Sequence, residues 1–197
     1  MAVTAEYEIG RIKTIIGMAL DFTAMLRVFE KGSGELIEGM LERFLERLQG
    51  VESPTQFDVL HDEFCRDFTT TIRLSKTKEG QSPDASYGHA AKVLDVALKA
   101  CVDYCQLPDA ATSQRVRAFL HAGIDTPILE YLKKEERLQI NAWSVREIDR
   151  QSYRLLQAAV ARQIESEFGG SILPVMWDDI MWRRLNRRDT ATVSSEA

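Results

Sequence analysis

Apolar residues recur at steps of three and four along most of the chain, which is the spacing of one face of an α-helix. The first stripe follows Thr4, a residue that can cap a helix, and continues to Gly32 and Gly34, where a helix commonly ends. Its apolar members are Ile9, Ile12, Ile16, Ala19, Phe22, Leu26 and Phe29. A second stripe fills 36–48 and stops at Gly50. No segment shows the period of two expected of a half-buried strand, so the pattern predicts helices throughout.

Capping signals mark where further helices begin. The run 53–56, Ser-Pro-Thr-Gln, combines a capping serine, a proline at the first helical position and a glutamine at the third. The run 144–147, Ser-Val-Arg-Glu, predicts a second capping box that opens a long helix ending near Phe168. Asp125 or Thr126 is expected to cap a short helix between these two.

The remaining segments complete a fold prediction. Helices are also predicted in three further places: 87–106, 113–121 and a last turn or two after Pro174. The polar segment 75–86 is the longest predicted loop. We therefore expect an all-α, single-domain bundle of about six to eight helices over 1–189, followed by a frayed C-terminal tail at 190–197.

Composition narrows the class of protein. Among 197 residues, 45% are hydrophobic and 28% are charged, which is ordinary for a globular domain. The net charge of −5 does not favour a nucleic-acid binder, although a local basic patch is compatible with it. The first residues lack the basic and apolar runs of a signal peptide, and no run is long enough to span a membrane. With three unevenly spaced cysteines, these features predict a cytoplasmic protein.

Metal-binding side chains occur only in isolated pairs. His61 lies three residues after Asp58 and four before Cys65, and Cys101 and Cys105 form another pair. A di-iron site in a helical bundle needs a second carboxylate-x-x-His pair, and the other two histidines have no acidic residue three positions earlier. A zinc site needs four ligands. We therefore expect no metal and no cofactor, with the cysteines as small core residues.

The predicted helix at 87–106 has the most distinctive polar face. His89, Lys92 and Lys99 fall near one side of it, with Asp95 between the lysines. One interpretation is a solvent-exposed stripe of ordinary ion pairs. The other is a groove in which the lysines bind an anion and the histidine transfers a proton. Gly88 in the first turn is expected to allow another backbone to approach closely.

A second candidate site lies on the predicted helix at 113–121. Arg115 and Arg117 precede His121 by six and four positions, giving Arg-x5-His and Arg-x3-His. This spacing resembles the motif of HEPN-type ribonucleases, which are helical and dimeric. The resemblance implies that arginine stabilises the phosphate charge and that His121 acts as a general acid or base. The alternative is an exposed basic helix whose histidine complements the helix dipole.

The middle of the chain also resembles a group of uncharacterised bacterial all-helical proteins. The shared features are Ser-Tyr-Gly followed by two lysines in 86–99 and the turn His-Ala-Gly-Ile-Asp-Thr in 121–126. The resemblance implies no activity. It does imply that the helix and the turn form one unit, which adds Tyr87 and Asp125 to the candidate ligand-binding residues.

These observations lead to two hypotheses. The first is a helical interaction protein, not an enzyme, that binds an anionic ligand or partner near 87–106. The second is a metal-independent ribonuclease, with nucleic acid as its partner. Trp177 and Trp182 on the C-terminal segment predict a homodimer contact, because aromatic residues are enriched at interfaces. The residues leave open whether the protein is an enzyme.

Overall fold

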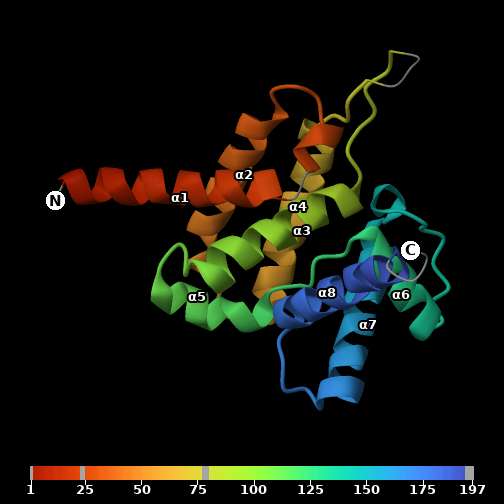
Figure 1. Ribbon diagram of the computed structural model, residues 1–197. Coiled ribbons are helices and arrows are strands. Elements are labelled where there is room, and N and C mark those ends of the chain that lie inside the picture. Colours follow the sequence, from red (N-terminus) through yellow and green to blue (C-terminus); the bar gives the residue numbers. More distant parts are fainter. Residues whose placement is uncertain (1, 23–24, 77–79, 194–197) are drawn as a thin grey trace.

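Eight α-helices form in the described part of the chain, which confirms the predicted all-α bundle (Figure 1). The computed structural model describes residues 2–22, 25–76 and 80–193. The helices are α1 (Ala2–Phe22), α2 (Ser33–Leu48), α3 (Pro54–Thr71), α4 (Tyr87–Leu98), α5 (Ala110–Val116), α6 (Thr126–Glu135), α7 (Arg150–Phe168) and α8 (Pro174–Val193). Shorter turns are η1 (Met25–Val28), the π-helix η2 (Lys99–Tyr104), η3 (Arg117–Phe119) and η4 (Val145–Glu147).

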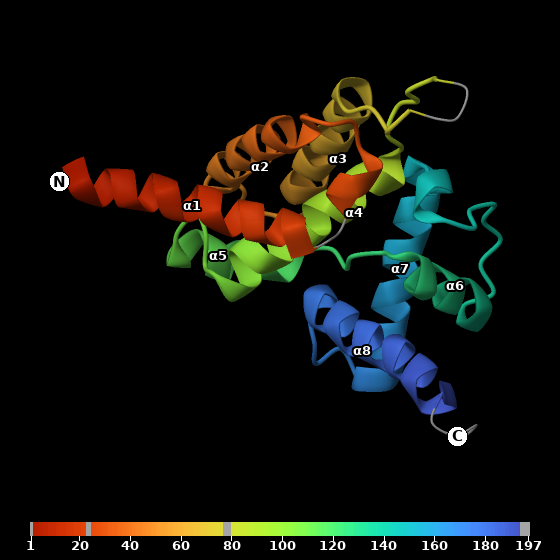
Figure 2. The same cartoon turned by 45° about the horizontal axis from the view of Figure 1, so that its top comes forward.

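Helix α4 lies at the centre of the arrangement. On one side it packs against α3 and α1, and on the other against α7 and η4. Helices α6, α7 and α8 pack against one another at the C-terminal end of the molecule, while the N-terminal half of α1 extends away from the other helices (Figure 2). Because α4 contacts both groups, its polar residues are positioned to meet side chains from distant parts of the sequence.

The core is rich in large side chains that the helical stripes predict. Phe57, Phe68, Leu94 and Trp177 are completely buried. Aromatic rings of α2 and α3 meet edge to face, with the centroids of Phe44 and Phe57 6.3 Å apart. Each such side chain contributes about 1.5–3 kcal/mol through burial. The burial of Trp177 also means that, of the two tryptophans on α8, only the half-exposed Trp182 is available for the predicted dimer contact.

Several predicted helix starts are confirmed. The Ser53 hydroxyl accepts a hydrogen bond from the Gln56 amide at the start of α3. Asp125 caps α6 by accepting from the Ile128 amide at 2.9 Å. Both caps satisfy a backbone N–H that has no partner within its own helix.

The predicted first helix is shorter than expected. It begins at Ala2, before Thr4, and ends at Phe22. The chain then forms η1 and reaches Gly32, whose φ of 94° places it in the left-handed region. Phe29 is nevertheless buried, against the ring of Phe68. A 3-10 turn can bury the same apolar positions as a helix, so the periodicity could not distinguish them.

The predicted capping box at Ser144 is wrong. Ser144 opens only the short turn η4, and Asp149 caps α7 by accepting from the Ser152 amide at 2.7 Å. The break follows from packing against α4, where the Gly88 amide donates to the carbonyl of Ile148 at 3.0 Å. A Cβ at Gly88 would lie 2.1 Å from the Val145 carbonyl oxygen, so the close approach predicted at this glycine is confirmed.

Three further boundaries differ from prediction. The helix expected at 87–106 is α-helical to Leu98 and continues as the π-helix η2. The helix expected at 113–121 ends earlier, so His121 lies in the non-helical segment before α6. Helix α8 has 20 residues instead of one or two turns, and its end at Val193 lies inside the predicted tail, of which 194–197 are outside the described residues.

None of the helices in the described segments is long and apolar enough to cross a membrane.

Candidate functional site

A pocket of about 210 Å³ lies between α3, α7 and the segment that joins η3 to α6. Polar and aromatic side chains from α3, α4, α7 and this segment line it: Asp58, His61, Asp62, Tyr87, His121, Tyr153, Arg154 and Gln157. A pocket of this size suits a small molecule or an ion, since binding sites for drug-sized molecules are about 300–1,000 Å³.

Helix α3 supplies much of the pocket because of simple helical spacing. Asp58, His61, Asp62 and Cys65 fall at steps of three, one and three, so they share one face of the helix. His61 and Cys65 are almost completely buried, whereas the Asp58 side chain is 56% exposed. This face of α3 therefore extends from the buried core, at Cys65 and His61, to the solvent-exposed opening of the pocket, at Asp58.

A continuous chain of hydrogen-bonding groups connects the core to the surface. We call its members the pocket cluster: Asp58, His61, Asp95, His121 and Tyr153. His61 Nε2 lies 3.0 Å from Asp95 Oδ1. The Tyr153 hydroxyl donates to Asp95 Oδ2 at 2.7 Å and lies 3.1 Å from His121 Nδ1. His121 Nε2 lies 3.0 Å from the carboxylate of Asp58.

The inner members of the pocket cluster are held away from water. The side chain of Asp95 has no exposed surface, and that of His61 is 2% exposed. Burial, together with the charge of Asp95, raises the pKa of Tyr153 well above its ordinary value, so its hydroxyl keeps its proton. At the outer end, the hydrogen bond from His121 lowers the pKa of Asp58 and keeps this carboxyl ionised.

The hydrogen bonds constrain the protons of His121. Since the single proton of Tyr153 goes to Asp95, Nδ1 of His121 must carry a proton to donate to the tyrosine oxygen. Its Nε2 must carry another to donate to the ionised Asp58. A neutral imidazole has only one proton. Within this series of hydrogen bonds, His121 can donate to both Tyr153 and Asp58 only as an imidazolium. The alternative is that its Nδ1 binds a different partner.

Of the side chains beside the pocket cluster, Asp62 and Tyr87 form hydrogen bonds with other residues, whereas Arg154 forms none in the described segments. Asp62 accepts from Arg150 at 2.5 Å and from the Tyr87 hydroxyl at 3.3 Å. Burial raises the pKa of Tyr87, which stays a neutral donor. Arg154 is exposed at the edge of the pocket and makes no hydrogen bond or ion pair with another residue of the described segments.

The segment carrying His121 is held by side chains from two helices. Gln157 of α7 binds both backbone groups of Ala122, donating to its carbonyl at 2.8 Å and accepting from its amide at 3.1 Å. The Gly123 amide donates to Asp178 of α8 at 3.3 Å. These bonds fix a stretch of non-helical backbone and so fix the position of the imidazole.

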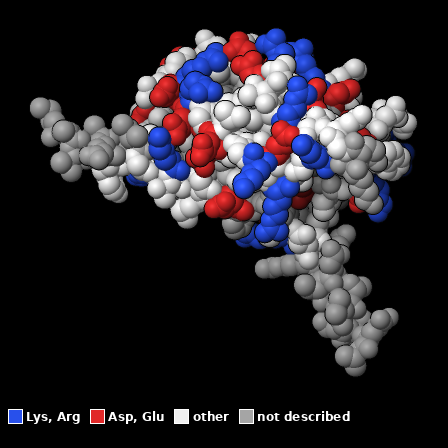
Figure 3. All heavy atoms as spheres, turned by 90° about the horizontal axis from the view of Figure 1, so that it is seen from above, with Lys and Arg blue, Asp and Glu red and all other residues white. Residues whose placement is uncertain are grey.

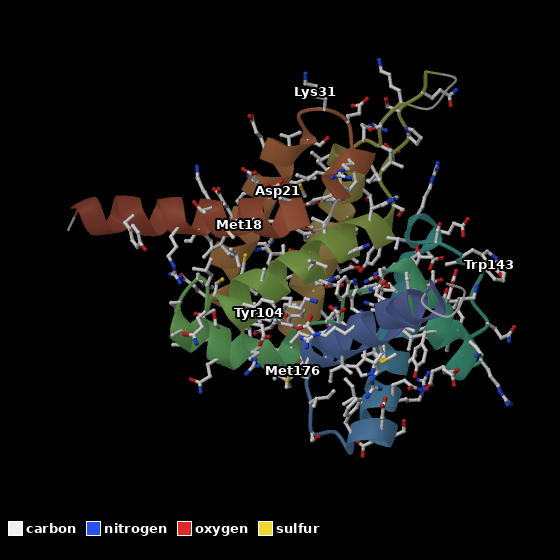
Figure 4. The ribbon with its side chains drawn as sticks, in the orientation of Figure 1. Met18, Asp21, Lys31, Tyr104, Trp143 and Met176 are labelled. Carbon is white, nitrogen blue, oxygen red and sulfur yellow. The ribbon has the colours of Figure 1, made fainter. Side chains whose placement is uncertain are left out.

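A second, partly buried polar cluster joins η2 to α8. We call it the α8 clasp: Lys99, Tyr104, Asp178 and Asp179. The ammonium of Lys99 lies 2.7 Å from Asp178 and 3.0 Å from Asp179. Tyr104, at the end of η2, donates to Asp179, and Figure 4 shows it beside the start of α8. Burial acts to lower the pKa of Lys99, but the two carboxylates outweigh it and raise the pKa.

The predicted ligand-binding residues fall into different places. Tyr87 lines the pocket, while Lys99 belongs to the α8 clasp and Asp125 caps α6. His89 is buried, and its Nδ1 accepts from the Ser86 amide at 3.2 Å in a capping box at the start of α4. Lys92 is half-exposed on α4 and does not line the pocket. The structure therefore does not gather the predicted anion-binding face into one groove.

The predicted ribonuclease residues also separate. Arg115 donates to the backbone carbonyls of Gln49 and Val51, at 2.8 and 2.9 Å. Arg117 forms an ion pair with Asp103. His121, in contrast, lines the pocket, and the arginine that lines the same pocket is Arg154. On the face shown in Figure 3, basic and acidic side chains are interspersed and form no large basic patch.

Comparison with known proteins supplies no relative. No protein-family model matches the chain, and neither the curated proteins nor the solved structures contain a significant match.

Proposed function

We propose that this protein binds a small anionic ligand in the pocket between α3 and α7. The observation that carries the proposal is Arg154, a cation at the edge of a polar pocket that makes no hydrogen bond or ion pair in the described segments. A guanidinium presents parallel N–H donors that match a carboxylate or phosphate group. The proposal retains an anionic ligand near α4 and replaces the predicted lysines with an arginine of α7.

The carboxylates of the pocket do not oppose an anion, because each is already paired. Asp62 is paired with Arg150, and Asp58 accepts from His121. Asp95 is bonded to His61 and Tyr153 and lies behind them. The donor that remains for a ligand is the guanidinium of Arg154, because both ring nitrogens of His121 already face partners.

Calorimetric titration with inorganic phosphate and with acetate tests the proposal. We expect one of these anions to bind, and binding to weaken at least tenfold in Arg154→Ala, since a hydrogen bond to a charged group contributes about 1.5–3 kcal/mol. Arg162→Ala is the matched control, because Arg162 lies on the same helix and pairs with Glu136 outside the pocket. Equal affinity in the wild type and Arg154→Ala would refute the role of Arg154.

A ribonuclease is the second candidate function, with Arg154 in place of Arg115 and Arg117. The proximity of the Arg154 guanidinium and the His121 imidazole in one pocket supports it. A single-stranded RNA oligonucleotide should be cleaved in the presence of a chelator, and His121→Ala should abolish cleavage. Cleavage that persists in His121→Ala would remove this candidate.

A further inference from the structure

We propose that the inner end of the pocket is a binding site for one divalent first-row transition-metal ion. Its protein ligands are His61 through Nε2, His121 through Nδ1 and the carboxylate of Asp95. The inference rests on the proposed function in one respect: the anion bound in the pocket is the additional ligand that completes the coordination of the ion. It assigns a role to the buried end of the pocket cluster, which an arginine at the mouth does not explain.

The ligand atoms already lie close enough to surround one ion. One donor atom from each of His61, Asp95 and His121 lies within 4.8 Å of the others. Ligands bonded at about 2.1 Å are about 3.0–3.4 Å apart when adjacent and about 4.2 Å apart when opposite. The His61–Asp95 distance of 3.0 Å falls in the first range. His121 is on a non-helical segment, and its donor atom lies within 4.8 Å of those of the other two residues.

The surroundings of His121 are those of a metal-bound histidine. A ligating imidazole commonly donates its second ring N–H to a carboxylate, which fixes its tautomer and orientation. His121 Nε2 lies 3.0 Å from Asp58 in this arrangement. With Nδ1 bound to a metal ion, the ring is neutral, its one proton goes to Asp58, and the requirement for an imidazolium disappears. His61 has a weaker counterpart, since its Nδ1 lies 3.7 Å from Cys65 Sγ.

The charge and chemistry of the ligands select the class of ion. Two imidazoles and one carboxylate suit zinc, iron(II), cobalt or manganese better than magnesium or calcium, which favour all-oxygen sites. The buried carboxylate of Asp95, whose partners in the described segments include no lysine or arginine, also favours a cation. Three protein ligands leave coordination positions open. The Tyr153 hydroxyl, 2.7–3.2 Å from all three ligating groups, faces one of these positions, and the pocket adjoins His61 and His121.

Metal titration of the full chain tests the site. Chelator-treated protein is dialysed against Zn²⁺, Mn²⁺ or Co²⁺, and bound metal is measured by mass spectrometry and, for Co²⁺, by visible absorption. We expect about one ion per chain in the wild type and a loss of that ion in His121→Ala, at a side chain that is 20% exposed. Asp58→Asn should weaken binding about 10–100-fold, as for other groups that orient a ligating histidine.

Matched controls separate the site from general effects. His89→Gln removes the one histidine outside the pocket cluster, and Asp67→Asn removes an exposed carboxylate of α3; both should keep the ion. No binding to the wild type, or equal binding to His121→Ala, overturns the metal site. Phosphate and acetate titrations of the chelator-treated and metal-loaded protein separate the two proposals. Metal binding without anion binding refutes the proposed function alone, and anion binding by a protein that takes up no metal refutes the metal site alone.

Discussion

Two polar clusters lie about one helical turn apart on the helix formed by α4 and η2, the pocket cluster at Asp95 and the α8 clasp at Lys99. In the clasp, one ammonium lies between two carboxylates, so opposite charges meet directly. In the pocket cluster, two carboxylates meet two imidazoles and a phenol. Each ring nitrogen of His121 faces a group that requires a proton from it, and a neutral imidazole carries only one proton. A cluster whose charges and hydrogen bonds are all paired internally supports the fold. A cluster with an unsatisfied hydrogen-bonding group beside a cavity is suited to bind a ligand or an ion.

Removing the central carboxylate of the pocket cluster should give the largest effect. Asp95→Ala leaves His61 and Tyr153 buried without their shared acceptor, so we expect a loss of about 3 kcal/mol in the free energy of unfolding. Asp179→Ala in the clasp should cost less than about 1 kcal/mol, because this side chain is 27% exposed and Asp178 remains as a partner for Lys99. Urea denaturation measures both; similar losses would show that the two clusters are energetically alike.

The pH dependence of stability should come partly from His89, the histidine outside the pocket cluster. Burial, with smaller contributions from Arg146 and Lys92, lowers its pKa from 6.5 to about 4. The folded protein favours the neutral ring, so this stability is complete above pH 6.5 and is lost as the pH falls toward 4, by about 3 kcal/mol. His89→Gln should flatten this slope while keeping the cap, since glutamine suits the same position of a capping box. An unchanged slope in urea denaturation would contradict this assignment to His89.

Asp178 in the clasp should give a slope of opposite sign. Burial raises its pKa from 3.8 to about 6, and Lys99 only partly opposes this. The folded protein favours the protonated acid, so this contribution is complete below pH 3.8 and is lost as the pH rises to 6, by up to about 3 kcal/mol. Asp178→Asn keeps an acceptor for the Gly123 amide and lacks the titration. The stability difference between the variant and the wild type should therefore move in favour of the variant as the pH rises, and a difference that stays constant with pH contradicts this.

The helices and several caps could be predicted because they depend on neighbouring residues. The residue types near Ser53 and Asp125 were sufficient to predict two helix starts, and the absence of a side chain at Gly88 was sufficient to predict a close backbone contact. The box at Ser144 failed because a contact with α4 decided where α7 begins. Local signals are thus reliable until a tertiary contact competes for the same backbone group.

The candidate site could be predicted only in part. His121 and Tyr87 were identified from a resemblance, and both line the pocket. His61 was considered for a metal and set aside because the spacing offered no second carboxylate-x-x-His pair and no set of four zinc ligands. Its contacts with Asp95 and Tyr153 join residues 34 and 92 positions apart. Helical periodicity assigns each residue to a face, but it does not say which faces meet, and Tyr153 therefore looked like an ordinary core residue of α7.

Helix α7 contacts the site at regular intervals, through Arg150 to Asp62, through Tyr153 to Asp95 and through Gln157 to Ala122. These contacts have a consequence for synthesis on the ribosome, where the N-terminal part of a chain emerges first. Helices α3 and α4 are complete some fifty residues before Tyr153 is added. Until then His61 and Asp95 lack the Tyr153 hydroxyl, and the arrival of α7 adds three of the contacts that hold the site.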